Sequence, residues 1–205
     1  MKPRGLLVVI SGPSGSGKGT VVNRVFEKSK DFSYSISATS RAPRPGETDG
    51  VHYHFKTRQE FEHLIQSGMV LEYTEYCGNY YGTLKSSVDG KLEQGINVVL
   101  EIEVNGALQV KAKYPETILV MLTPPNITTL EKRLRDRGTN DEEDIKRRLM
   151  RTCDEMRFFN QYDYFIVNED GKVDECADEF INIINSELHK TSRNVVFADK
   201  FFNKK

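Results

Sequence analysis

The sequence predicts an α/β protein built on a parallel sheet, with helices between its strands. Short runs of apolar and β-branched residues recur at 6–10, 98–102, 118–122 and 165–167. Such runs are typical of strands that are buried on both faces, as in a parallel sheet. Helical stretches separate these runs, and strands that alternate with helices favour right-handed crossover connections.

The predicted helices lie at 20–28, 84–93, 105–113 and 173–189, and along a tract from 127 to 159 that is interrupted near Gly138. Pro115 ends the third helix, because proline has no N–H to donate inside a helix. In the last helix, Ala177, Phe180 and Ile184 recur at helical spacing and give the helix one apolar face. That face is expected to pack on the sheet.

Two segments depart from this alternation. Residues 38–83 contain short alternating strands, turn signals and one helix that begins near Thr57 and Glu60 and ends at Gly68, which predicts a small, mainly β insertion. Residues 126–151 are densely charged, and form either a mobile helical lid or two ordinary solvated helices. The predicted core is then 1–37, 84–125 and 152–190, followed by a C-terminal tail at 191–205.

Composition narrows the class of protein. The chain has 205 residues, with 29 Lys and Arg against 30 Asp and Glu, a balance that argues against coating nucleic acid or an anionic membrane. Its three cysteines are dispersed and lack metal-ligand spacing, so we expect reduced thiols. The apolar run at 6–10 is too short for a signal sequence or a membrane span. A cytoplasmic protein is the expectation.

The stretch "ISGPSGSGKGT" at 10–20 has the spacing of a phosphate-binding loop, with Gly12 and Gly17 five residues apart and Lys18 next. It lies between a predicted strand and a predicted helix, where backbone N–H groups, the helix dipole and the lysine converge on an anion. Gly19 stands where such loops usually have a Ser or Thr that reaches Mg²⁺. The residues expected to bind ATP here are Gly12, Pro13, Ser14, Gly15, Ser16, Gly17, Lys18, Gly19 and Thr20.

A second anion site is indicated by Arg41 and Arg44, which are separated by Ala-Pro. Arginine forks suit bidentate recognition of phosphate, and the prolines at 43 and 45 restrict the local backbone. Two solvated arginines in a loop are the alternative interpretation of this pair taken alone.

Taken together, "GPSGSGKGT", "TSRAPRPGE", "YHF", "LEY", "GNYYGT", "LEIEVNG", "RLRDRGT" and "FIVNED" resemble the guanylate kinase family over about 5–190. The resemblance implies a P-loop nucleoside-monophosphate kinase fold, with a parallel five-stranded core, an inserted GMP-binding lobe and a helical lid. The two irregular segments fall where the lobe and the lid belong. It also implies Mg²⁺-dependent transfer of the γ-phosphoryl group of ATP to GMP, giving ADP and GDP.

The resemblance also assigns residues. Around the GMP phosphate it places Ser37, Arg41, Arg44, Tyr53 and Tyr81, and around the guanine Glu72, Thr83 and Glu103. For transfer it implies Lys18, Arg41, Arg137 and Arg148, with Arg133 and Asn168 on the ATP side and Thr20 and Glu101 near Mg²⁺, partly through water. Guanine offers two adjacent N–H donors, which one carboxylate can accept together.

Several alternatives stay open at this level. An adenylate kinase would have the same loop, and a guanylate-kinase-like scaffold module would keep the fold without catalysis. His52 and His54 flank Tyr53, but a metal pair there would need further ligands.

ATP and GMP are the expected partners, without nucleic acid or membrane, and the protein is either a monomer or a homodimer. The aromatic tail residues Phe197, Phe201 and Phe202 pack either on the core or on a partner.

Overall fold

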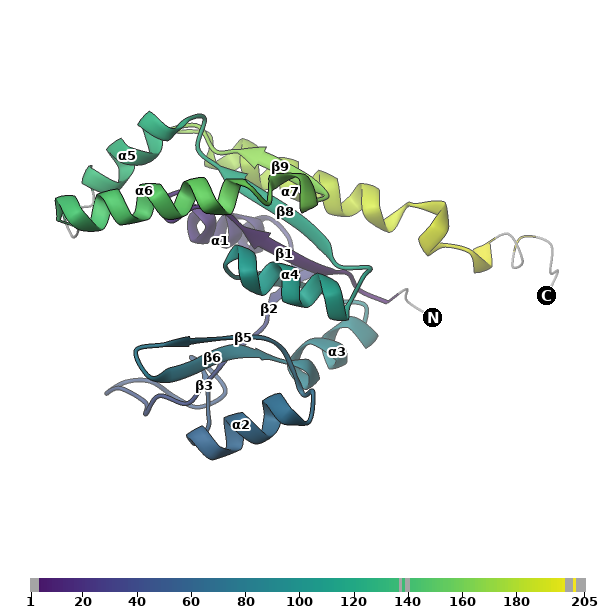
Figure 1. Cartoon of the computed structure of the whole chain (residues 1–205). Coiled ribbons are helices and arrows are strands. Elements are labelled where there is room, and N and C mark those ends of the chain that lie inside the picture. Colours follow the sequence, from purple (N-terminus) through teal and green to yellow (C-terminus); the bar gives the residue numbers. More distant parts are fainter. Residues whose placement is uncertain (1–3, 137, 139–140, 198–200, 202–205) are drawn as a thin grey trace.

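The computed structural model describes residues 4–136, 138, 141–197 and 201, and its centre is a five-stranded parallel sheet (Figure 1). The strand order is β2-β7-β1-β8-β9, and each neighbouring pair is parallel. The strands are β1 (Leu7–Ser11), β2 (Phe32–Tyr34), β7 (Asn97–Glu101), β8 (Ile118–Thr123) and β9 (Tyr164–Val167). The predicted α/β class and parallel core are confirmed.

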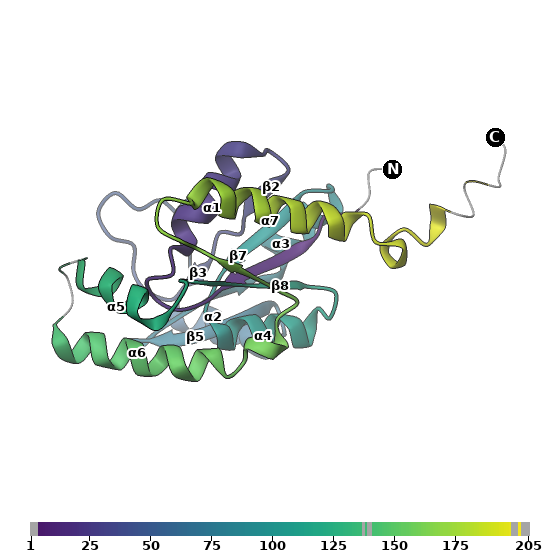
Figure 2. The same ribbon diagram turned by 90° about the horizontal axis from the view of Figure 1, so that it is seen from above.

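Helices cover both faces of this sheet (Figure 2). On one face lie α1 (Lys18–Lys28) and α7 (Val173–Leu188), and on the other lie α3 (Lys85–Glu93) and α4 (Val104–Lys113). Alternate residues of β1 belong to the two cores, because successive strand side chains point to opposite faces. Val8 packs with α1 and α7, whereas Val9 packs with α3 and α4.

A second, smaller sheet lies below the core sheet in Figure 1, in the order β4-β3-β6-β5. Its strands are β3 (Ala38–Thr39), β4 (His54–Phe55), β5 (Val70–Tyr76) and β6 (Asn79–Leu84). The helix α2 (Arg58–Gln66) buries Phe61 against it and begins with a capping box between Thr57 and Glu60, as the sequence indicated. The side chain of Gln109, on α4, exchanges hydrogen bonds with the backbone of Tyr73, so β5 is docked on the core.

The charged tract forms two helices, α5 (Ile127–Asp136) and α6 (Glu142–Met156), with the predicted break around Gly138. Leu130, Leu134 and Ile145 form a small core between them. The helix α5 packs against the phosphate-binding loop, since a Cβ on Gly15 would lie 2.9 Å from Cδ1 of Leu130. The helices on the two sides of the break therefore pack on each other.

The strand β2 was not predicted. It has three residues and lies at the sheet edge, where it pairs only with β7 among the described strands. Its polar central residue, Ser33, interrupts the apolar run that identified the other strands. In the described ranges, no helix is both long and apolar enough to cross a membrane.

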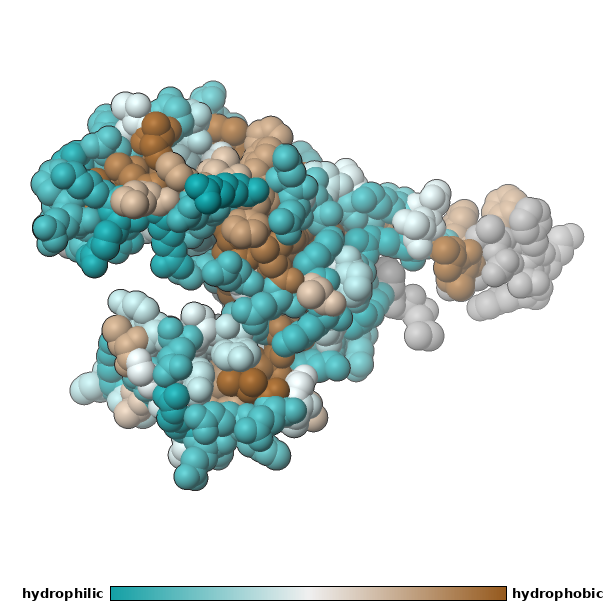
Figure 3. Space-filling view, in the orientation of Figure 1, coloured by the Kyte–Doolittle hydropathy of each residue, from teal (hydrophilic) through white to brown (hydrophobic). Residues whose placement is uncertain are grey.

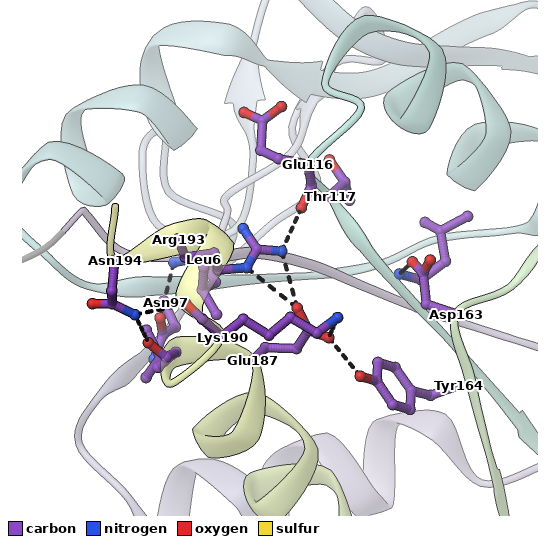
Figure 4. Close-up of polar contacts among 12 residues, drawn as sticks. Leu6, Asn97, Glu116, Thr117, Asp163, Tyr164, Glu187, Lys190, Arg193 and Asn194 are labelled. Atoms are coloured by element: carbon purple, nitrogen blue, oxygen red, sulfur yellow. Dashed lines mark hydrogen bonds and ion pairs between the residues drawn. The ribbon is translucent and has the colours of Figure 1, made fainter. Parts of the chain in front are cut away.

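The C-terminal segment is anchored by a buried carboxylate, that of Glu187 on α7 (Figure 4). It accepts a hydrogen bond from the Tyr164 hydroxyl at 2.5 Å, pairs with Lys190, and accepts from Nη2 of Arg193 at 3.1 Å. Burial opposes its ionisation, but these donors outweigh burial and lower the pKa of Glu187. The contacts hold the short helix Thr191–Arg193 against the core.

Beyond this anchor, residues 195–197 extend away from the body of the protein (Figure 1). Phe197 is 69% exposed and Phe201 is 74% exposed, and the centres of their rings lie 6.5 Å apart. Phe202 lies outside the described residues.

Candidate functional site

A cleft separates the small sheet from the core and the α5–α6 pair (Figure 3). Its larger cavity, of about 880 Å³, is lined by the phosphate-binding loop, the end of β7 and one face of α6. A second cavity of about 440 Å³ is lined by β5, β6 and the start of α4. Glu101, Ile102, Glu103 and Arg151 line both cavities, so the two meet at the carboxyl end of β7. Open α/β sheets bind ligands at this edge.

The loop after β1 has the backbone of an anion cradle. Gly12 and Gly17 have φ of 143° and 89°, a region that strongly favours glycine, and Gly17 is the N-cap of α1. A Cβ on Gly12 would lie 2.1 Å from the carbonyl oxygen of Leu122. Nζ of Lys18 bends back over the loop and donates to the carbonyl oxygens of Gly12, at 2.7 Å, and Pro13, at 3.1 Å. The ammonium group therefore lies at the mouth of the cradle.

Asn168 braces this loop from behind. It is buried, and its Nδ2 donates to the carbonyl oxygen of Ser16 at 2.8 Å. A Cβ on Gly17 would lie 2.4 Å from that same nitrogen. Nη2 of Arg133 donates to the Asn168 carbonyl oxygen at 2.8 Å, and its Nε donates to Asp170 at 3.0 Å. Neither Asn168 nor Arg133 is among the described residues that line the larger cavity.

Glu101 lies beside the loop at the position that Gly19 leaves open. A Cβ on Gly19 would lie 3.6 and 3.7 Å from the two carboxylate oxygens of Glu101. Partial burial raises the pKa of the Glu101 carboxyl, and nearby Lys18 acts in the opposite direction. Thr20 is exposed in the first turn of α1. A carboxylate and a hydroxyl beside a phosphate cradle fit Mg²⁺, which prefers oxygen ligands and keeps several waters and substrate oxygens.

The two arginines flank a carboxylate that sequence reasoning missed. Arg41 forms a bidentate pair with Glu47, with both N–O distances 2.9 Å, and the Arg44 backbone N–H donates to Glu47 at 2.6 Å. These hydrogen bonds lower the pKa of Glu47 to about 2, and they raise the pKa of Arg41. The Arg41 guanidinium also lies 5.5 Å from the centre of the Tyr53 ring. The position of Glu47 three residues after Arg44, in "RPGE", was the available signal.

The smaller cavity gathers most of the predicted acceptor residues. Those that line it are Ser37, Tyr53, Glu72, Tyr81 and Glu103. The Tyr53 and Tyr81 rings meet edge to face at 6.1 Å, and Tyr81 also interacts with Arg41. The Arg44 side chain is exposed in the loop beside them.

Glu72 is a buried carboxylate in this cavity, with 6% of the residue exposed. The Thr83 hydroxyl donates to its Oε1 at 2.7 Å, and burial raises the pKa of Glu72 while Thr83 and Lys113 act against that. A Cβ on Gly106 would lie 3.1 Å from Oε2 of Glu72. Gly106 therefore leaves room for this carboxylate, and both residues line the smaller cavity.

The helix α6 reaches the loop through Arg148, whose Nη1 donates to Oγ of Ser14 at 2.6 Å. One turn further on, Arg151 pairs with Glu103. Arg137, predicted as a catalytic residue, lies outside the described residues. His52 accepts a hydrogen bond from the Thr48 N–H at 3.0 Å, and His54 lies 3.3 Å from the Ser87 hydroxyl. The two histidines thus have separate polar partners.

A glycine-rich loop with a lysine after the central strand of a parallel sheet defines a P-loop protein, and two cavities meet beside that loop. The family model for guanylate kinase matches residues 4–187, and the chain belongs to this family. A guanylate kinase of Lactococcus lactis subsp. lactis is 50% identical over 193 residues, which is 94% of this chain and 93% of that protein. One from Streptococcus thermophilus is 50% identical over 94% of this chain and 92% of its own length. A crystal structure of guanylate kinase from Anaplasma phagocytophilum has a TM-score of 0.72 at 28% identity, and covers 100% of this chain and 99% of that one.

Proposed function

We propose that this chain transfers the γ-phosphoryl group of ATP to GMP, giving ADP and GDP. The observation that supports this most is the buried Glu72–Thr83 pair in a cavity that adjoins the phosphate-loop cavity. Family membership favours the same reaction. The adenylate kinase alternative is not favoured by the family match, and the intact loop lysine argues against a non-catalytic module.

On the donor side, we propose that the loop N–H groups and Lys18 hold the phosphates of ATP. Both kinds of group stabilise negative charge at the proposed position of these phosphates. Phosphoryl transfer depends mainly on positioning and on charge stabilisation. Arg148, which already reaches Ser14, would add a cation from the opposite wall. Asn168 and Arg133 serve this site by supporting the loop from behind.

On the acceptor side, the phosphate of GMP would lie against Arg41, Arg44 and the hydroxyls of Ser37, Tyr53 and Tyr81. Glu47 fixes the Arg41 fork through both Nη atoms, so little side-chain freedom is lost on binding. The GMP phosphate has a second pKa of about 6 and is largely ionised at neutral pH. Its oxygen can therefore attack without a general base.

The guanine base would be recognised by Glu72 with Glu103 nearby. An ionised carboxylate accepts both N–H donors of the guanine pairing edge, which adenine lacks. Thr83 donates to Glu72 in the structure, so its hydroxyl orients the carboxylate.

Glu101 and Thr20 are the residues that would hold Mg²⁺, partly through water. When bound, Mg²⁺ would neutralise negative charge on the donor phosphates. Glu101 can also orient a water or the Lys18 ammonium at the same edge of the loop, since the positive charge of Lys18 acts to lower the pKa of Glu101.

Three functional parts complete the proposal. Residues 38–83 act as the GMP-binding lobe, 126–151 as the lid and the remainder up to 190 as the core. Closure of the lobe and lid would exclude water, which otherwise competes for the phosphoryl group. A cytoplasmic location would place the enzyme with its nucleotide substrates.

The test is direct detection of both products. The protein is incubated with ATP, Mg²⁺ and GMP, and the nucleotides are separated by ion-exchange chromatography. Equal amounts of ADP and GDP are expected, and neither should form when GMP is omitted. Formation of ADP with free phosphate but no GDP would refute the proposal.

A further inference from the structure

Arg151 is the lid residue that lies where the two cavities meet. It lies on α6 and lines both the larger cavity, which we assign to ATP and call the donor cavity, and the smaller cavity, which we assign to GMP and call the acceptor cavity. It also lines a third cavity, beside the start of α4. No role was predicted for Arg151, because it belongs to none of the motifs that identified the site. From this position Arg151 can contact residues of both proposed subsites, the one for ATP and the one for GMP.

Two carboxylates are its partners. Nη2 of Arg151 pairs with Oε2 of Glu103, which lines the acceptor cavity, and its Nε lies 3.3 Å from Oε1 of Glu155, on α6 itself. The Glu155 side chain is only 14% exposed. Burial raises the pKa of Glu155 and the negative charge of Glu103 adds to this, while Arg151 and Lys18 act against it. Without Arg151, two carboxylates would face the cleft that receives two polyanions.

Two other arginines, one on α6 and one just after it, form ion pairs with carboxylates close by in the sequence. Arg147 pairs with Asp144 one turn back on the same helix, and its side chain is 75% exposed. Arg157, just after the helix, pairs with Asp154 in the same way and is 78% exposed. Among the described arginines of this segment, Arg151 is the one paired with a carboxylate of the acceptor cavity.

Arg151 also shares a helix face with Arg148. Residues three apart on a helix are neighbours on its surface. Fixing Arg151 on Glu103 therefore fixes the turn of α6 that presents Arg148 to Ser14 of the phosphate loop. The chain of contacts runs from the guanine subsite to the donor phosphates through one turn of helix.

We propose that Arg151 is a positioning residue that couples GMP binding to nucleotide binding in the donor site, through its pair with Glu103. This inference rests on the proposed function, since it assigns the two cavities to GMP and ATP. A guanine base against Glu103 restrains that carboxylate, which then holds Arg151 and with it the lid helix. By linkage, donor nucleotide must strengthen GMP binding by the same factor.

The expected size of the coupling follows from exposure. The Arg151 and Glu103 side chains are 58% and 61% exposed, and ion pairs of that kind shift equilibria by roughly 1.5- to 5-fold. The wild-type protein should therefore bind GMP tighter in the presence of saturating Mg²⁺ and ADP by at least this factor. ADP is the suitable probe because it leaves GMP unphosphorylated.

The experiment measures the Kd of GMP by isothermal titration calorimetry, with and without saturating Mg²⁺ and ADP. In Arg151→Gln the ratio of the two Kd values should fall by roughly 1.5- to 5-fold, and Arg151→Lys should keep part of it. Arg157→Gln, which removes the same charge from a self-contained pair, should leave the ratio unchanged. Combining Arg151→Gln with Glu103→Gln should lower the ratio no further than the larger single effect.

The proposal is overturned if the ratio in Arg151→Gln equals that of the wild type, or if the losses from Arg151 and Glu103 simply add. It is also overturned if the wild-type protein shows no coupling. Thermal melting of each variant separates these outcomes from misfolding, and Arg151→Lys provides a second variant. Because the readout is a ratio of binding constants, its failure is distinct from a failure of phosphoryl transfer in the wild-type enzyme.

Discussion

Replacing Glu72 by glutamine tests how this protein distinguishes guanine. Glu72 is buried with 6% exposure, and one of its oxygens already accepts from Thr83. Glutamine keeps the shape of the side chain, but its amide presents one acceptor and one NH₂ donor. Guanine offers two N–H donors to this position, so one of them would face another donor.

The magnitude follows from the lost bond. A hydrogen bond to a charged group contributes about 1.5–3 kcal/mol. At 1.4 kcal/mol per tenfold, the KM for GMP should rise roughly 10- to 150-fold. The fold should not weaken, because burial raises the pKa of Glu72 and therefore disfavours its charged form. An unchanged or slightly higher Tm is expected.

A coupled assay for ADP, with saturating ATP and Mg²⁺, measures KM for GMP and for inosine monophosphate. Inosine monophosphate keeps N1–H and O6 but lacks the 2-amino group, so the wild-type protein should prefer GMP. Glu72→Gln should reduce that preference. Glu75→Gln is the matched control: Glu75 lies on the same strand but pairs with Arg58.

Two results would refute the reasoning. One is a KM for GMP that stays within twofold of the wild-type value. The other is a raised KM with an unchanged preference for GMP over inosine monophosphate, which would mean that Glu72 supports the lobe and does not contact the base.

Three further changes have clear expectations. Lys18→Ala removes the cation at the loop mouth and should lower kcat roughly 10²- to 10³-fold with little change in Tm. Gly106→Ala places a Cβ 3.1 Å from Oε2 of Glu72 and should raise the KM for GMP, whereas Gly90→Ala, on a helix and open to solvent, should not. Glu187→Gln should lower the free energy of unfolding by about 1–3 kcal/mol at pH 7, measured by urea denaturation. Because folding lowers the pKa of Glu187, that difference is present above its ordinary value of 4.5 and disappears as the pH falls through the folded-state pKa.

Each of these has an outcome that contradicts it. Near-wild-type kcat in Lys18→Ala would remove the lysine from the transfer step. Equal KM values for the two glycine variants would mean that Glu72 has room to move. A stability difference that persists unchanged to pH 3 would show that the Glu187 charge does not anchor the C-terminal segment.

The parts predicted from sequence are those encoded locally. The phosphate loop could be found because its glycines, lysine, strand and helix are contiguous, and Gly12 and Gly17 do adopt the positive φ that the motif requires. The strands β1, β7, β8 and β9 could be found because each contains a run of apolar residues, although Phe165 and Val167 of β9 are exposed at the sheet edge. In contrast, β2 is too short and too polar at Ser33 to stand out from a loop.

The parts that were missed depend on contacts between distant segments. Arg151 meets Glu103 across 48 positions, and nothing in the spacing of the charged tract distinguishes it from Arg147. Asn168 was expected beside adenine, and nothing in the sequence indicated that its amide also donates to the Ser16 carbonyl, a contact between the end of β9 and the loop after β1. Sequence gives the type of residue at a site more readily than its partner.

The most direct test of the proposed function is acceptor choice. With ATP and Mg²⁺ held constant, initial rates of ADP formation are compared for GMP, AMP and UMP at equal concentrations below saturation. A buried carboxylate that accepts two N–H donors predicts that kcat/KM for GMP exceeds that for AMP by at least tenfold. AMP or UMP matching or exceeding GMP would contradict the assignment of the smaller cavity to guanine.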